Sequence, residues 1–158
     1  MVSEPGEGIS HWDRGAQGMN RVQNKVYNAL NELPHKISID GLLWHQGETD
    51  WFYEGTADPD ISWPVRSDYY PVKLSALIKN LRNENWYNSK MPFICGETIY
   101  ATGVNRHLSA LNIDNDPMTA CVGGAGLPAT NNTGGHFNAS ALRLMGRWYA
   151  DRYYSLAR

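Results

Sequence analysis

Apolar residues recur at helical spacing in four separate parts of the chain. The first pattern spans residues 19–33 and is followed by Pro34, so it predicts a helix that ends there. Further helices are predicted over 70–81, with Pro71 in the first turn, over 104–111, and after Asn138, a residue suited to an N-cap. We expect the last helix to bury the face formed by Leu142, Met145, Tyr149, Tyr153 and Leu156.

Between these helices, short apolar runs predict strands over 37–45, 92–95 and 118–122. The second half of the first run is continuously apolar, as in parallel strands that helices cover on both faces. Strands that alternate with helices indicate one α/β domain over residues 1–158, a three-layer α/β/α sandwich around a central parallel sheet. Such sheets usually have about five strands. Because this chain opens with a loop over 1–18, we expect the first strand of the fold to be missing.

One segment, residues 48–69, carries no apolar period and contains Gly55, Pro59, Pro64 and several aromatic residues. A loop of this length inside a compact domain is usually functional, often a lid or a binding loop. We therefore expect this segment to contribute to binding.

Composition excludes several classes of protein. The 158 residues carry a net charge of −2 without a basic stripe, which argues against nucleic-acid binding. No apolar run approaches the ~18 residues of a membrane helix, so we expect no membrane partner. Cys95 and Cys121 lie in apolar segments and are predicted to be buried free thiols. No histidine pair has zinc-ligand spacing, so no metal site is predicted.

Two polar clusters follow predicted strands, at residues 44–50 and 131–138. Ligands of open α/β sheets bind beyond the carboxyl ends of the strands, so we expect both clusters at one edge. His136 is then a candidate base, Glu48 an acid that orients it, and Gln46 an amide donor to a developing oxyanion. We interpret His45 as a packed residue at the strand end, not a base.

The sequences DGLLWHQGETD at 40–50 and GGHFNASALRLMGRWYA at 134–150 resemble the SGNH (GDSL-type) hydrolase superfamily. Within it they are most similar to the sialate O-acetylesterase and acetylxylan esterase group, carbohydrate esterase family 6. The stretch GEGISHW at 6–12 is similar to the Gly-Gly block of that group. The resemblance implies an SGNH-hydrolase fold and removal of O-acetyl groups from a carbohydrate or another small ester by serine-type acyl transfer, without a cofactor.

By the same resemblance, His136 is the catalytic base, Glu48 braces it, and Gln46 with the backbone N–H of Gly6 forms the oxyanion hole. Trp12, Trp51 and Trp63 are candidates to stack on sugar rings, although aromatic-rich loops also form small cores. The chain departs from the family at two points. The block that carries the nucleophilic serine is absent, and the Asp expected three residues before the histidine is Thr133.

Three hypotheses remain. The first is an acetylesterase with His136 as base, whose nucleophile comes from a segment missing in front of this chain. The second is a non-catalytic carbohydrate-binding or assembly module derived from such an esterase. The third is a short esterase that uses Ser10, or a water activated by His136 and Glu48. In that case a homo-oligomer would cover the sheet edge that the missing strand leaves bare.

Overall fold

The computed structural model describes residues 6–33, 37–52, 66–99, 102–110, 116–124, 126–130 and 135–158. Its centre is a parallel sheet of three strands in the order β1-β2-β3. These strands are β1 (Leu42–Trp44), β2 (Phe93–Gly96) and β3 (Thr119–Val122). In their register Leu43 pairs with Ile94, and Cys95 pairs with Cys121. The predicted parallel sheet is therefore confirmed.

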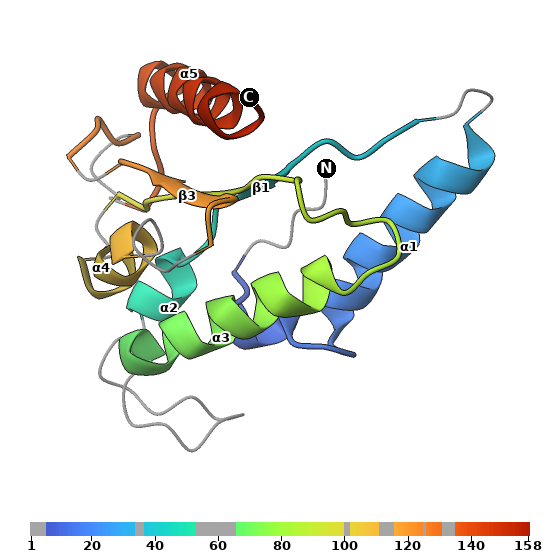
Figure 1. Ribbon diagram of the computed structural model, residues 1–158. Helices are drawn as coiled ribbons and strands as arrows, with labels where there is room; N and C mark the ends of the chain where they lie inside the picture. Colours follow the sequence, from blue (N-terminus) through green and yellow to red (C-terminus); the bar gives the residue numbers. More distant parts are fainter. Residues whose placement is uncertain are drawn as a thin grey trace.

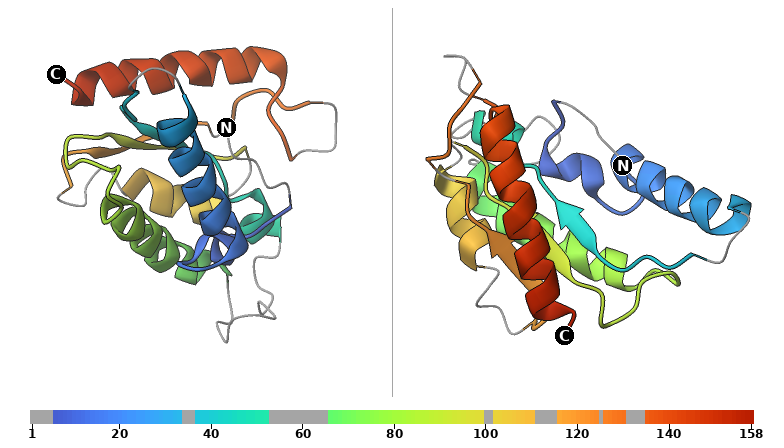
Figure 2. Two further views of the ribbon diagram at one scale, coloured as in Figure 1. Left: turned by 90° about the vertical axis from the view of Figure 1, so that its right-hand side faces the viewer. Right: turned by 90° about the horizontal axis from the view of Figure 1, so that it is seen from above.

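Helices lie on both faces of this sheet (Figure 1). The 3-10 helix η1 (Ile9–Trp12) and helices α1 (Gln17–Glu32), α2 (Glu48–Phe52), α3 (Arg66–Arg82) and α4 (Thr102–Ala110) lie on one side. Helix α5 (Ala139–Leu156) crosses the opposite face, as the turned views also show (Figure 2). This arrangement is the predicted three-layer α/β/α sandwich.

The central strand β2 is buried along its whole length because each of its faces meets a different core. Phe93 and Cys95 pack with Leu74 of α3 and Val104 of α4. Ile94 points the other way and packs among the apolar side chains of α5, including Met145. The two cores explain why the run over 92–95 is continuously apolar.

Strand β1 differs from β2, since it has a neighbouring strand on one side within the described residues. Its central residue Leu43 is 61% exposed. Leu43 shares the α5 side of the sheet with Ile94, but α5 packs on β2 and β3. Leu43 is therefore an exposed apolar residue on a strand at the edge of the described sheet, and the further strand expected from the sequence stays a prediction.

Several predicted boundaries were wrong. Strand β1 is shorter than the run over 37–45, and α3 begins at Arg66, so Pro71 lies inside the helix rather than in its first turn. Helices η1 and α2 lie in segments predicted to be loops. On α5, Leu142 is 54% exposed and Ala141 is buried in its place.

The start of α5 and the state of both cysteines were predicted correctly. The Asn138 side chain accepts hydrogen bonds from the backbone N–H groups of Ser140 and Ala141, which makes it the N-cap. Cys95 and Cys121 are buried free thiols. Across the described residues, we find no helix with the length and apolar character needed to cross a membrane.

Candidate active site

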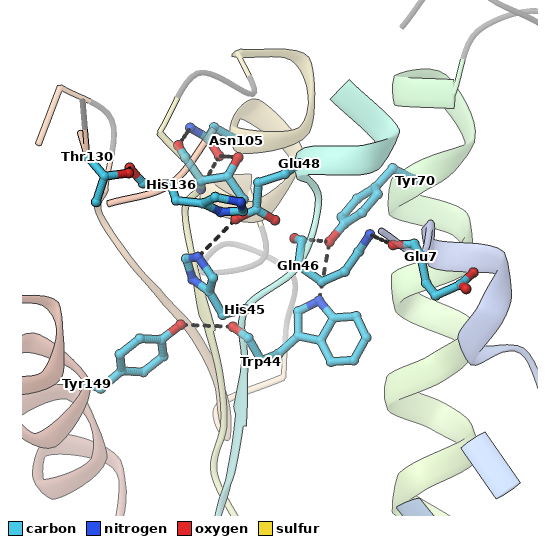
Figure 3. A network of polar contacts seen from close by, with 11 residues as sticks. Glu7, Trp44, His45, Gln46, Glu48, Tyr70, Asn105, Thr130, His136 and Tyr149 are labelled. Carbon is cyan, nitrogen blue, oxygen red and sulfur yellow. Dashed lines mark hydrogen bonds and ion pairs between the residues drawn. The ribbon is translucent and has the colours of Figure 1, made fainter. Parts of the chain in front are cut away.

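A tight turn carries the chain from the end of β1 into α2. Gly47 occupies this turn with a φ of +141°, a conformation that residues with a side chain rarely adopt. A Cβ at this position would also lie 2.7 Å from Cγ1 of Val104. Glycine therefore permits the sharp turn that places Glu48 just beyond the carboxyl end of β1 (Figure 3).

Asp50, on the first turn of α2, is fully buried and accepts hydrogen bonds from three directions. The backbone N–H of Ile9 contacts both carboxylate oxygens, at 3.2 and 3.0 Å. The Gln46 amide donates at 2.5 Å, and the Tyr69 hydroxyl lies at 3.5 Å. Asp50 thus fastens the N-terminal helix η1 to the turn after β1.

Gln46 makes hydrogen bonds through its side-chain amide and through its backbone carbonyl. Its Nε2 also donates to the carbonyl of Glu7, at 3.2 Å. The backbone carbonyl of Gln46 accepts a hydrogen bond from the Tyr70 hydroxyl at 2.8 Å. The Tyr70 hydroxyl in turn accepts the indole N–H of Trp44 at 3.2 Å (Figure 3). Burial raises the pKa of Tyr70 well above its usual value, so this hydroxyl stays a donor.

These contacts change the picture of Gln46 as an oxyanion donor. Both hydrogens of its amide are engaged, one by Asp50 and the other by Glu7. Its Oε1 is buried without a hydrogen-bond partner among the described residues. In this conformation Gln46 braces the turn and has no free N–H to offer, so its role toward an oxyanion stays a prediction.

Glu48 lies between two imidazoles. Its Oε1 is 3.3 Å from Nε2 of His45, and His136 lies beside it (Figure 3). Burial by itself would raise the pKa of this carboxyl. The hydrogen bond and charge of His45, a backbone hydrogen bond at Glu48 and the charge of His136 outweigh burial and lower the pKa. Glu48 is therefore a carboxylate that favours positive charge on nearby rings.

His136 presents an exposed side chain from a fixed backbone. Its carbonyl accepts the backbone N–H of Thr130 at 2.9 Å and the Thr130 hydroxyl at 3.3 Å. The next residue, Phe137, is buried and forms an antiparallel bridge with Ala129. The segment before α5 thus holds the His136 ring at the edge of the sheet where Glu48 lies, as predicted.

The remaining predicted residues are less closely tied to this centre. Ser10 is a half-buried residue of η1, and its hydroxyl forms no hydrogen bond to His136 or to another described residue. Gly6 is exposed, with a φ of +81°. The side chain of Trp51, on α2, and the residues Trp63 and Thr133 lie outside the described part of the chain.

Trp12 does not lie where a sugar could reach its face. It is 7% exposed and meets Trp44 edge-on, with ring centroids 5.3 Å apart. Both rings belong to the core beneath β1. We therefore correct the expectation that Trp12 stacks on a sugar, because this aromatic residue fills the core.

Sequence reasoning missed His45, which it interpreted as packed. Its side chain is 35% exposed and pairs with Glu48. The available signal was the spacing, since His45 and Glu48 are three residues apart across a strand end and a helix start. The buried Asn105 was missed too. It receives the N–H of Thr98 at 2.8 Å and donates to its carbonyl at 2.6 Å, which fixes the exit of β2.

Among the residues that the structure describes, we find no group of three or more His, Cys, Asp or Glu side chains that could hold a metal ion. The side chains that lie at this edge are the imidazoles of His45 and His136, the carboxylate of Glu48 and the amide of Gln46.

Comparisons with known proteins identify a family and a related fold. A model of the family described as "Carbohydrate esterase, sialic acid-specific acetylesterase" matches residues 1–155. The crystal structure of a protein from Arabidopsis thaliana superimposes with a TM-score of 0.74 at 24% sequence identity. The match covers 95% of this chain and 57% of the plant chain, so it supports the fold and spans little over half of that relative. No curated protein matches this sequence.

Proposed function

Because the chain belongs to the carbohydrate esterase family of sialic acid-specific acetylesterases, we propose that its site removes O-acetyl groups from a carbohydrate, with His136 as general base. The observation that carries the proposal is the position of Glu48 beside the exposed ring of His136, at the carboxyl ends of the strands. A carboxylate next to the base stabilises the imidazolium that forms when the base takes a proton.

The proposed reaction is acyl transfer in two stages. A hydroxyl attacks the acetyl carbonyl while His136 takes its proton, and the same ring then protonates the departing sugar oxygen. Water then attacks the acyl-enzyme while His136 takes its proton, and the ring returns this proton to the departing hydroxyl oxygen as acetate is released. These steps use side chains and water, and no cofactor is part of the proposal.

The nucleophilic hydroxyl is the least supported element of this scheme. Ser10 is the hydroxyl to test, because η1 is fastened to the turn before α2 through Asp50 and Ile9. The alternatives to Ser10 are a hydroxyl elsewhere and a water activated by His136 and Glu48.

A second candidate function is a non-catalytic carbohydrate-binding module. The engaged amide of Gln46 favours it, because an oxyanion hole needs a donor that is free to point at the substrate. In that case the site would bind an acetylated sugar and leave its ester intact.

The test is acetate release from O-acetylated sialic acid and from acetylated xylo-oligosaccharides, followed by proton NMR. We expect hydrolysis by the 158-residue chain and a loss of about 100-fold or more in His136→Ala. Ser10→Ala decides the nucleophile, with the exposed Ser75→Ala on α3 as its matched control.

Each result has a separate meaning. Hydrolysis that persists in Ser10→Ala and disappears in His136→Ala would indicate another nucleophile or water. Loss in both variants would assign the nucleophile to Ser10. Binding of an acetylated sugar without hydrolysis would contradict the esterase and support the binding module.

A further inference from the structure

His45 connects the two segments that build the site. Its Nε2 lies 3.3 Å from Oε1 of Glu48 on α2. Its ring also contacts the ring of Phe137, with centroids 5.8 Å apart and planes tilted by 55°. Since Phe137 directly follows His136, the His45 side chain contacts both the segment that carries His136 and the Glu48 carboxylate, the second contact being drawn in Figure 3.

The backbone around His45 is fixed by α5 and β2. The carbonyl of Trp44, the preceding residue, accepts the Tyr149 hydroxyl at 2.9 Å. Beside it, Gly96 leaves the space that this close approach needs, because a Cβ there would overlap the Tyr149 hydroxyl and lie 3.0 Å from Nδ1 of His45. The neighbouring residues therefore fix the position of the His45 ring, and its Nε2 points toward Glu48.

We infer that His45 is a positioning residue that shares the Glu48 carboxylate with His136 and so sets how strongly this carboxylate supports the base. When neutral, the His45 ring donates one N–H to Glu48 and holds the carboxylate in place. When protonated, it adds a second positive charge beside the same carboxylate. That charge competes with a positive charge on His136 for the same carboxylate, so His45 weakens the support that Glu48 gives to the base.

The other titratable side chains near His45 and His136 are either uncharged at neutral pH or hydrogen-bonded to the backbone. Burial raises the pKa of Tyr149 on α5 and of Cys95 on β2 well above their usual values, and that of Cys121 on β3 to about 12. The Glu97 carboxylate, after β2, accepts the backbone N–H of Gly124 at 2.9 Å. Among these groups, Glu48 is the carboxylate for which a contact with His45 is observed.

The first test follows the ring protons of the histidines by NMR as pH is varied in the unliganded chain, and it needs no enzymatic activity. The signals are assigned with single variants of the histidines. In His45→Gln the second positive charge is gone, so we expect the His136 ring signals to change at a higher pH than in the wild type. In Glu48→Gln the signals of both rings should change at a lower pH, while the exposed Glu32→Gln on α1 serves as the control.

A second variant separates charge from packing. His45→Phe keeps a ring against Phe137 but has no N–H for Glu48, whereas His45→Gln keeps a donor without the charge. The kinetic part of this inference rests on the proposed esterase activity. In that reaction we expect kcat at pH 8 to fall about 10-fold in His45→Phe with KM unchanged, and to stay within 3-fold of the wild type in His45→Gln.

The outcomes separate this inference from the proposed function. An unchanged titration of the His136 signals in His45→Gln, or a Glu48→Gln variant that moves only His45, would overturn the sharing of Glu48. Equal loss of kcat in both His45 variants would overturn the positioning role. Absence of hydrolysis in the wild type, with the NMR shifts as expected, would contradict the esterase and leave the shared carboxylate supported.

Discussion

Two carboxylates stand two residues apart on α2, and their surroundings assign them different tasks. Asp50 is fully buried and receives the N–H of Ile9 and the amide of Gln46. Glu48 is 29% exposed at the side chain and faces the imidazoles of His45 and His136. Donors that belong to the framework surround Asp50, whereas groups that exchange protons surround Glu48. The neighbours, more than the residue type, separate a structural carboxylate from a chemical one.

The largest expected effect comes from removing the structural carboxylate. Asp50→Ala leaves the Ile9 N–H and the Gln46 amide without their acceptor in a buried place. We expect a loss of about 3 kcal/mol or more in the free energy of unfolding, measured by urea titration. The exposed Asp151→Ala on α5 is the control and should stay within about 0.5 kcal/mol of the wild type. A cost for Asp50→Ala as small as that of the control would contradict its structural role.

Glu48→Gln probes the other side of the comparison. The amide keeps the size of the side chain but cannot stabilise an imidazolium on His136. We expect kcat/KM for acetate release to fall about 100-fold, while the free energy of unfolding changes by less than about 1 kcal/mol. A variant that loses stability and keeps its activity would show instead that Glu48 is a second structural carboxylate.

Gln46 lies between the two carboxylates in sequence, and its contacts connect it to Asp50. Gln46→Leu should cost about 1 to 2 kcal/mol, because Asp50 and the Glu7 carbonyl each lose a donor. A double-mutant cycle with Asp50→Ala should give a coupling energy above about 0.5 kcal/mol in urea unfolding. Additive losses in the free energy of unfolding would mean that the two side chains act independently. Gln46 would then be available to contact the substrate.

The comparison also shows what the sequence can and cannot predict. Periodicity is local, so it predicted the alternation of strands and helices, and the N-cap at Asn138 follows from a local preference. Helix α2 and η1 are short and are tied together by the contact of Asp50 with Ile9, residues 41 positions apart. Such contacts form only in the folded chain, so no local sequence pattern predicts them.

At the site, sequence motifs predicted that Glu48 and His136 lie at one edge, and the structure brings them there. The same reasoning named Trp12 as a candidate for sugar stacking, with a small core as the alternative, and the structure favours the core. It interpreted His45 as packed at the strand end and did not foresee its contact with Glu48. An aromatic residue in an irregular segment carries no sign of whether its ring faces solvent or core. Trp12 is buried because Trp44 and the core beneath β1 receive its ring.

The smallest expected effect concerns the acid stability of the chain. The pKa of Glu48 is lowered in the folded state, so its carboxylate stabilises the fold fully above its usual pKa of 4.5. This contribution is lost as pH falls through the lowered pKa. We therefore expect wild type and Glu48→Gln to differ in the free energy of unfolding above pH 5, and this difference to shrink steadily as the pH of the urea titrations is lowered below 4.5. A difference that grows on acidification would reverse the sign and show that burial, which disfavours the charge, outweighs the two imidazoles.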